Sequence, residues 1–286
     1  MKKILVVFNS RSGRQKAFSY KRIIFKRFKE EGISFKFIYI SMLPLIKDIE
    51  KYDTIVAVGG DGTVLGVLPY IVNSSRKLGI IPCGTANLFA EGLLIPSNIN
   101  KALDIILSDK TSDIDIGKAD NQYFSLRVGL GYDADIINGA KTGLKNKIGY
   151  LAYFLQGIIS LFKLNRKTYK IKIDGREIIV NASSVIISNA GNMFKNLFTV
   201  APKGAVDDGK LDIFILCAKN FLDFVEVFMQ ILFGFHHPNS KVMYAQAATV
   251  SIVVEDESLH IDGENRKLPH NLNISVLPEA VKVFVP

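Results

Sequence analysis

The chain has 286 residues, of which 48% are hydrophobic and 22% are charged, and its net charge is +9. This balance is typical of a globular protein and excludes a disordered or fibrous chain. Its two cysteines, Cys83 and Cys217, lie far apart, which excludes a disulfide framework or a cysteine-rich zinc site. No uncharged run reaches the ~20 residues of a spanning helix. The apolar run at 4–8 is too short for a secretory signal, so we expect a cytoplasmic protein.

Strands and helices alternate over the first 115 residues. Continuous apolar runs predict strands that are covered on both faces, and apolar residues at helical spacing predict the helices between them. The predicted strands are 4–8, 35–40, 54–58 and 78–81, and the predicted helices are 15–31, 64–72, 86–93 and 99–107. Because strands alternate with helices, we expect βα units and a largely parallel sheet.

The pattern changes after Asp115. Short strands now dominate, and Asp174-Gly175 between two of them is a hairpin signal. The predicted strands are 123–128, 169–173, 177–180, 185–188, 210–217, 248–254 and 272–276, with helices near 148–162 and 221–233. We therefore expect an α/β domain at 1–115 and a mainly antiparallel, sandwich-like β domain at 116–279. The last residues, 280–286, are a candidate strand that returns to the first domain.

The strongest motif lies between an apolar strand and a helix, and it reads Gly59-Gly60-Asp61-Gly62-Thr63. A backbone approaches a phosphate closely only where side chains are absent, and the N–H groups of such a turn bind anions. Thr63 can cap the helix or contact a phosphate oxygen. Asp61 would act through bound Mg²⁺ or by accepting hydrogen bonds from loop donors. The same residues also make an ordinary tight turn, so this motif alone does not distinguish a phosphate site from a structural turn.

Two companion turns follow other strands of the predicted sheet. One follows the first strand and reads Asn9-Ser10-Arg11-Ser12-Gly13; the other follows the fourth strand and reads Gly84-Thr85-Ala86-Asn87. In an open α/β sheet, ligands bind outside the carboxyl ends of the strands. Three small, glycine-containing turns at that edge favour a nucleotide site over turns that serve packing alone.

These three turns, in this order, resemble the catalytic domain shared by diacylglycerol kinases, sphingosine kinases and their bacterial lipid-kinase relatives. The resemblance runs over nearly the whole chain. It includes 84–90, 113–117, Ala201-Pro202 with the metal-binding turn 207–212, and Ile261-Asp262-Gly263-Glu264. It implies an ATP-dependent kinase that transfers the γ-phosphate to a lipid hydroxyl, with diacylglycerol converted to phosphatidic acid as the leading reaction.

The resemblance also implies roles for individual residues. Glu264 matches the general base, and Asp61 and Asp115 match acidic residues that position the catalytic Mg²⁺. Asp208 matches the ligand of a structural Mg²⁺, which the backbone carbonyls of Ala205 and Lys210 complete. The residues that match nucleotide contacts are Asn9, Ser10, Arg11, Ser12, Gly13, Ser41, Gly59, Gly60, Asp61, Gly62, Thr63, Thr85 and Asn87.

Three positions depart from the family's pattern. Gln156 lies where some relatives carry a lysine, Leu88 lies where many carry an aspartate, and Arg127 lies in a strand where relatives are usually apolar. These departures concern the identity of the lipid more than catalysis. Asp-Gly-Glu at 262–264 is also ordinary hairpin-turn chemistry, and only the family resemblance favours a catalytic role.

Two other functions stay open on the sequence. One is a soluble NAD kinase, which resembles this family in Gly-Gly-Asp-Gly-Thr, and the other is a non-catalytic lipid or nucleotide sensor on the same scaffold. The chain has no Gly-Lys-Ser/Thr motif, which argues against a P-loop mechanism. We expect a lipid substrate, no nucleic acid, and peripheral contact with the inner face of the membrane through the basic first helix. The sequence does not distinguish a homodimer from a monomer.

Overall fold

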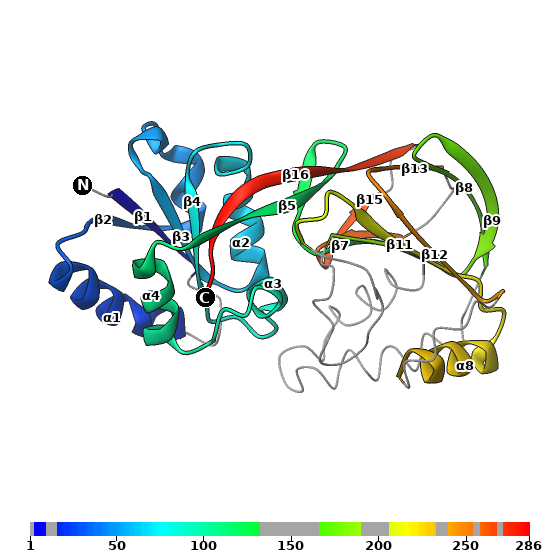
Figure 1. The fold of residues 1–286 in the computed structure, drawn as a ribbon, viewed down its shortest axis with the longest axis horizontal. Coiled ribbons are helices and arrows are strands. Elements are labelled where there is room, and N and C mark those ends of the chain that lie inside the picture. The colour runs from blue at the N-terminus through cyan, green and yellow to red at the C-terminus, as the bar shows by residue number, and fades with distance from the viewer. Residues whose placement is uncertain are drawn as a thin grey trace. The chain divides into compact units, whose positions relative to one another are not determined.

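The computed structural model describes residues 3–9, 16–131, 166–189, 206–232, 240–253, 258–267 and 271–286. The chain divides into two compact units, which are considered separately (Figure 1). Unit 1 comprises residues 1–116 with 278–286, and unit 2 comprises residues 117–277. The chain passes from one unit to the other twice, within the strands β5 (Thr111–Ala119) and β16 (Leu272–Phe284).

The sheet of unit 1 is largely parallel, and β5 pairs with β16 at one side of it. Its order is β2 (Ser34–Tyr39), β1 (Lys3–Phe8), β3 (Thr54–Gly59), β4 (Lys77–Pro82) and then the last part of β16. Every residue of β3 is buried, and so is every residue of β1 after Lys3. Strands covered on both faces need continuous apolar sequence, which is why these runs identified the parallel sheet correctly.

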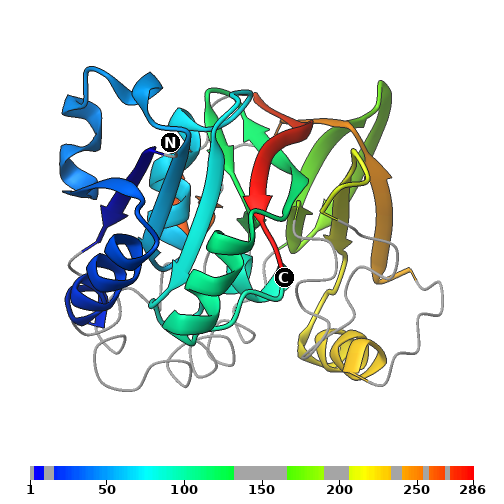
Figure 2. The same ribbon diagram turned by 60° about the vertical axis from the view of Figure 1, so that its left-hand side comes forward.

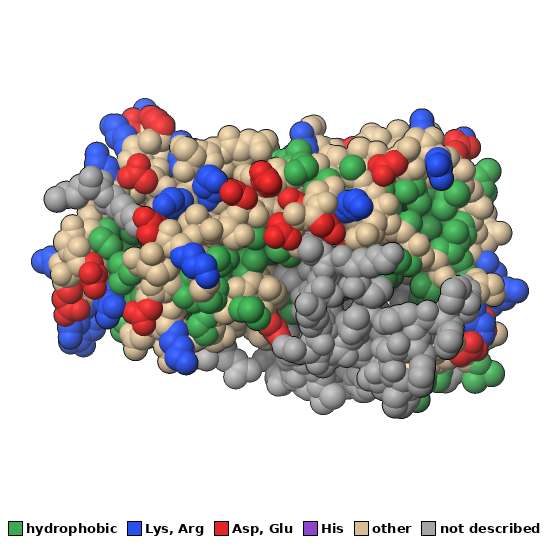
Figure 3. Space-filling model, in the orientation of Figure 1, with side chains coloured by type: hydrophobic (Ala, Val, Ile, Leu, Met, Phe, Trp, Pro, Cys, Tyr) green, Lys and Arg blue, Asp and Glu red, His purple; other side chains and the backbone are tan. Residues whose placement is uncertain are grey.

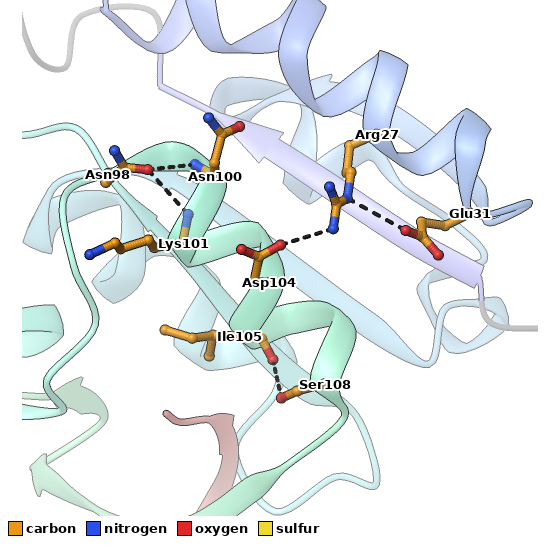
Figure 4. Close-up of polar contacts among 8 residues, drawn as sticks. All are labelled: Arg27, Glu31, Asn98, Asn100, Lys101, Asp104, Ile105 and Ser108. Carbon is orange, nitrogen blue, oxygen red and sulfur yellow. Dashed lines mark hydrogen bonds and ion pairs between the residues drawn. The ribbon is translucent and has the colours of Figure 1, made fainter.

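Helices cover both faces of this sheet. Figure 2 shows α1 (Lys16–Glu30) and α4 (Ile99–Ser108) in front of the strands and α2 (Asp61–Val67) behind them. The two front helices are joined by Arg27, which donates to Asp104 at 2.9 Å (Figure 4). Asn98 caps α4, because its side chain accepts hydrogen bonds from the N–H groups of Asn100 and Lys101.

Short helical segments complete unit 1. They are η2 (Ile40–Leu45), η3 (Ile49–Lys51), η4 (Leu68–Tyr70) and α3 (Leu88–Gly92). The helix predicted at 64–72 differs from the structure, since α2 begins at Asp61 and gives way to the 3-10 turn η4. Pro69 lies in that turn and has no N–H to continue an α-helical ladder.

Unit 2 contains two sheets. One is antiparallel throughout, in the order β12 (Val242–Ala247), β11 (Leu211–Leu216), β10 (Ser184–Ser188), β7 (Arg127–Gly131), β14 (Ser258–Ile261) and β15 (Glu264–Lys267). The other joins the first part of β16 to β13 (Thr249–Val253), β8 (Lys167–Ile173) and β9 (Arg176–Ala182). In addition, β5 pairs with β6 (Gln122–Phe124).

Alternate residues of these strands form one buried core. Val128 and Leu130 of β7 belong to it, as do Ile213 and Ile215 of β11 and Tyr169 of β8. Because side chains alternate between the two faces of a strand, the intervening residues point away from this core. The parallel first part and the antiparallel second part confirm the predicted fold class.

Several predicted elements differ in their limits. The strand predicted at 123–128 is two strands, because N–H groups at its centre donate to the carboxylate of Asp262 instead of to a neighbouring strand. The strands predicted at 272–276 and 280–285 are one, β16. Strands β5, β12, β14 and β15 were not predicted. The helix predicted at 148–162 lies outside the described residues, and that at 221–233 is α8 (Phe221–Leu232). In the described part of the chain, no helix is long and apolar enough to cross a membrane.

The start of α8 is held by reciprocal hydrogen bonds. The Asn220 side chain accepts from the N–H of Asp223 at 2.9 Å, and the Asp223 carboxylate accepts from the N–H of Lys219 at 2.9 Å. Lys241 lies 3.0 Å from the same carboxylate. The hydrogen bond from Lys219 and the ammonium group of Lys241 lower the pKa of Asp223. Lys241 also pairs with Glu226 in the second turn of the helix.

Replacing Asp223 with Asn should make the stability of the protein less dependent on pH in the acidic range. A carboxyl group with a lowered folded-state pKa stabilises the fold above about pH 4 and loses that effect as the pH falls through the folded-state value. Thermal unfolding should therefore show a lower Tm for D223N at pH 7, and a smaller difference from wild type at pH 3. A difference that stays the same at both pH values would contradict this role for Asp223.

Candidate functional site

The predicted nucleotide turns lie at one edge of the unit 1 sheet. Asn9, Ser41, Gly60 and Gly84 each follow the carboxyl end of a strand, namely β1, β2, β3 and β4. These strands are parallel neighbours, so their carboxyl ends meet at the same edge. The N–H of Asn9 donates to the carbonyl of Val58 at 3.2 Å, which keeps the chain leaving β1 beside the end of β3. Residues 10–13 of the first turn lie outside the described residues.

Two of these turns touch through glycine. An added Cβ at Gly84 would lie 2.5 Å from the Cα of Gly60, and one at Gly60 would lie 3.1 Å from the Cα of Gly84. The ends of β3 and β4 are also bonded to each other, since the N–H of Cys83 donates to the carbonyl of Gly59 at 2.9 Å. The two turns therefore approach each other backbone to backbone, and a side chain at Gly84 would force one of them to move.

Polar side chains brace the same turns. The Asp61 carboxylate accepts a hydrogen bond from the N–H of Phe89 at 3.0 Å and so ties the start of α2 to α3. The Asn87 side chain closes its own turn, because it accepts from the N–H of Gly84 at 2.8 Å and donates to the carbonyl of Gly84 at 3.1 Å. Asn87 has a φ of +54°, in the left-handed region that asparagine tolerates. These contacts fix the turns before any ligand binds.

The groups that this edge presents are mainly backbone N–H groups. Those of Asp61 and Gly62 lie in the first turn of α2 and have no intrahelical acceptor. Gly62 and Thr85 are exposed. The side chain of Thr63 is instead fully buried against Gly59, and its hydroxyl has no partner among the described residues. A contact between the Thr63 hydroxyl and a phosphate would therefore require a local movement.

Asp115 lies in β5 and is buried. Its carboxylate accepts a hydrogen bond from the N–H of Glu279 at 2.8 Å. Glu279 lies in β16 and has a φ of +51°. In this position Asp115 holds the backbone of β16. Any role in placing a metal ion would be additional to this contact.

The Asp-Gly-Glu motif forms a β-hairpin in unit 2. Asp262 and Gly263 make its turn with φ values of +46° and +78°, and Glu264 begins β15. Positive φ at both positions is the geometry that favours an aspartate followed by a glycine. The interpretation as a hairpin turn is therefore correct, and it leaves room for a catalytic role of Glu264.

The Asp262 carboxylate clamps this turn to the segment between β6 and β7. It accepts four hydrogen bonds: from the N–H groups of Ser125 (2.7 Å), Leu126 (2.9 Å) and Arg127 (2.8 Å), and from the hydroxyl of Ser125 (3.0 Å). Burial raises the pKa of Asp262, and the four donors oppose this because they favour the charged form. With both oxygens engaged, Asp262 is suited to holding the turn that carries Glu264.

Glu264 itself is half-exposed, with 51% of its side chain accessible. Its Oε2 accepts a hydrogen bond from the guanidinium of Arg266 at 2.7 Å. A carboxylate at this position can accept a proton from an alcohol that approaches it from solvent.

Asp208 lies in an exposed turn, where its carboxylate accepts from the N–H of Lys210 at 3.0 Å. Ala205 lies outside the described residues. The amide of Gln246 links two carboxylates, since it lies 3.4 Å from Asp208 and 3.1 Å from Asp212. The hydroxyl of Tyr244 donates to Asp212 at 2.6 Å.

The neighbourhood of Asp208 is suited to a hard cation. Burial raises the pKa of Asp212, and the nearby charge of Asp208 adds to this effect. Burial and the carboxylate of Asp212 likewise raise the pKa of Tyr244. Carboxylate oxygens are donors that Mg²⁺ prefers, and Asp208 and Asp212 supply two such groups. Within the described ranges, no three His, Cys, Asp or Glu side chains are grouped to hold a metal, so carbonyl ligands would be needed.

Sequence reasoning missed the partners of these acidic residues. It placed Asp262 in a turn but predicted none of its hydrogen-bond partners, and it assigned no role to the Asp212–Tyr244–Gln246 contacts or to Arg266. Asp262-Gly263 was visible as a turn, but the N–H groups that its carboxylate binds lie more than 130 positions away in the sequence. No local pattern signals such a contact.

Comparison with known proteins identifies both parts of the chain. Residues 3–119 match the diacylglycerol kinase catalytic domain, and residues 126–285 match the YegS C-terminal NAD kinase beta sandwich-like domain. A diacylglycerol kinase of Staphylococcus aureus (strain bovine RF122 / ET3-1) is 31% identical over 242 residues, which cover 83% of this chain and 76% of the relative. One of Bacillus subtilis (strain 168) is 33% identical over 224 residues, which cover 76% and 72%. The chain therefore belongs to the diacylglycerol kinase family.

Solved structures show the same fold. A diacylglycerol kinase from Bacillus anthracis strain Sterne aligns with a TM-score of 0.76 at 22% identity, covering 100% of this chain and 97% of that one. An NAD kinase from Archaeoglobus fulgidus in complex with ATP aligns with a TM-score of 0.56 at 13% identity, covering 99% and 93%. At these identities the likeness concerns the fold alone.

Replacing Gly84 with Ala should damage the edge that carries the turns. The new methyl group would overlap the backbone of Gly60, so one of the two turns must move. We expect a fold that unfolds cooperatively and an affinity for ATP that falls at least about tenfold, measured by isothermal titration. Gly175, in the hairpin β8–β9, is a matched control because nothing lies near an added side chain there. Its φ of +87° disfavours alanine, so the control variant is G175N, since asparagine tolerates positive φ. Equal ATP affinity for G84A and G175N would contradict the role of this contact.

Proposed function

We propose that this protein is an ATP-dependent lipid kinase that transfers the γ-phosphate to a lipid hydroxyl, with diacylglycerol as acceptor and phosphatidic acid as product. The observation that carries the proposal is the contact of Gly60 with Gly84, which brings two N–H-rich turns together at the carboxyl edge of a parallel sheet. The names of the curated relatives support the choice of acceptor. The ATP in the solved NAD kinase supports the choice of donor.

Unit 1 would hold the nucleotide. The phosphates would be bound by the backbone N–H groups of Asp61 and Gly62 in one turn and of Thr85 in the other, with Asn9 and Ser41 at the neighbouring strand ends. Phosphoryl transfer is mostly a matter of positioning and charge neutralisation, and a bound Mg²⁺ supplies part of that neutralisation. Asp61 and Asp115 are the carboxylates that would hold this ion, since both lie in unit 1. Asp61 has the more exposed side chain of the two.

Unit 2 would supply the base and a structural metal site. Glu264 accepts the proton of the lipid hydroxyl while the hydroxyl oxygen attacks the γ-phosphorus and the bond to ADP breaks. Asp262 keeps the Glu264 turn in place through its four hydrogen bonds. Asp208, with the carbonyls of Ala205 and Lys210, would bind a Mg²⁺ that rigidifies the turn at 206–210.

The lipid substrate requires contact with a membrane surface, and we propose a peripheral contact at the inner face of the cytoplasmic membrane. On α1, Lys21, Arg22, Lys26 and Lys29 are exposed, and 44% of Phe25 is accessible among them. Figure 3 shows acidic side chains intermixed with basic ones in this part of the surface, so the attraction is local and moderate. Binding to anionic vesicles should weaken as salt rises, and binding that is independent of salt would contradict an electrostatic contact.

A second function has support from one comparison. The Archaeoglobus fulgidus NAD kinase shares the fold at a TM-score of 0.56. An NAD kinase would phosphorylate a soluble dinucleotide and would need no lipid. The same assay can separate the two functions, because NAD and diacylglycerol can be offered to the protein in parallel.

The direct test is a kinase assay with labelled ATP, Mg²⁺ and mixed micelles of diacylglycerol. The wild type should label the lipid and leave NAD unlabelled, and chelation of Mg²⁺ should abolish labelling. Glu264→Gln keeps the size of the side chain but removes its ability to take a proton. We expect E264Q to lower kcat by about 10²–10⁴-fold with little change in the affinity for ATP.

Glu177→Gln is a matched control, because Glu177 is another half-exposed glutamate of unit 2 that pairs with a neighbouring cation, Lys170. It should keep the wild-type rate. Lipid labelling by E264Q at the wild-type rate would rule out Glu264 as the base. Labelling of NAD in place of lipid would favour the second function.

A further inference from the structure

The carboxylate of Glu264 has one neighbour that the proposed mechanism does not use. Among the described residues, Arg266 is the side chain that contacts this carboxylate, and its Nη2 lies 2.7 Å from Oε2. The other oxygen, Oε1, has no hydrogen-bond partner within the described residues. The two oxygens of the candidate base are therefore in different environments.

The strand places these two side chains together. Glu264 and Arg266 are two residues apart in β15, so they project from the same face. They lie opposite Ile261 and Leu259 of β14, both of which belong to the core of unit 2. Because β15 is the last strand of its sheet, this face ends at the sheet edge, and 51% of Glu264 and 41% of Arg266 stay accessible.

Arg266 is anchored at a second point. Its Nε donates to the side-chain oxygen of Gln122 at 3.1 Å. Gln122 lies in β6 and is paired with Ala119 of β5. The turn before it is also fixed, since Asp120 exchanges hydrogen bonds with the backbone of Asn273 at 2.8 Å and 3.1 Å. The guanidinium thus connects the edge strand β15 to a braced hairpin of the other sheet.

We propose that Arg266, anchored by Gln122, is a positioning residue that holds Glu264 so that Oε1 faces the acceptor hydroxyl. The inference rests on the proposed function, and it names the group that orients the base of that reaction. The guanidinium occupies Oε2, and the proton of the lipid hydroxyl goes to Oε1 as the new bond to the γ-phosphorus forms. Asp262 fixes the backbone on one side of Glu264, and Arg266 fixes the side chain on the other.

The geometry of arginine suits this role. Its planar guanidinium offers donors in a fixed fork, so Nε binds Gln122 while Nη2 of the same plane binds Glu264. A lysine at the same position offers a single point charge and cannot hold both partners in one plane. A glutamate without such a partner would sample several rotamers, and a displacement of about 1 Å costs an enzyme on the order of 10²-fold in rate.

The competing explanation is an ordinary surface ion pair. Pairs between exposed side chains contribute little to stability. Such a pair would be replaceable with no effect on catalysis. The two explanations therefore differ in what they predict for kcat, and agree that stability changes little.

The test compares variants in the diacylglycerol assay. R266M should lower kcat by at least about tenfold while the KM values for ATP and lipid change less than about twofold, because the base is misplaced but binding is not. R266K should restore part of the rate, and Q122A should show a smaller loss than R266M. Lys170→Met breaks another exposed pair of unit 2, with Glu177 at 3.2 Å, and should keep the wild-type rate.

The inference is overturned if R266M keeps kcat within about twofold of wild type, or if its loss is matched by K170M. If the wild type phosphorylates no lipid, the proposed function is wrong. The role of Arg266 can then be tested by a second measurement that does not depend on kinase activity. In spectra of ¹⁵N-labelled arginine, the Nε–H of Arg266 should exchange slowly with solvent in wild type and faster in both Q122A and E264Q. Fast exchange in wild type would show that Arg266 is not held, and would overturn the inference.

Discussion

The approach of two glycines is the constraint on which the proposed nucleotide-binding edge depends. The turns after β3 and β4 meet with the backbone of Gly60 against that of Gly84, at a spacing that leaves no room for a side chain. This contact places two sets of N–H groups side by side, and Asp61 and Asn87 hold them there through hydrogen bonds to neighbouring backbone. A rigid array of donors that is formed before the ligand arrives loses little entropy on binding a polyphosphate.

Unit 2 achieves rigidity by another route. Its catalytic candidate lies on a hairpin at the edge of an antiparallel sheet, where a side chain would ordinarily move freely. The carboxylate of Asp262 binds the turn to the backbone between β6 and β7, and Arg266 ties the same hairpin to Gln122. A general base needs this kind of support, because its effect depends on its distance from the proton that it accepts.

The sequence allowed the fold class and the positions of the glycine turns to be predicted, because both follow from local patterns. Continuous apolar runs marked the buried strands β1 and β3, and Asp174-Gly175 marked the hairpin of β8 and β9. What it could not reveal were contacts between distant segments. The strand predicted at 123–128 is broken by hydrogen bonds to Asp262, and the burial of Thr63 follows from its packing against Gly59. Side-chain direction at such positions is set by tertiary packing and leaves no mark in the local sequence.

The most direct measurement of the central claim is a crystal structure with a non-hydrolysable ATP analogue and Mg²⁺. Phosphate oxygens should lie within hydrogen-bond distance of the N–H groups of Asp61 or Gly62 in one turn and of Thr85 in the other. The two turns should also stay in the contact described here. An analogue bound with its phosphates away from both turns would show that the glycine contact does not form the phosphate site.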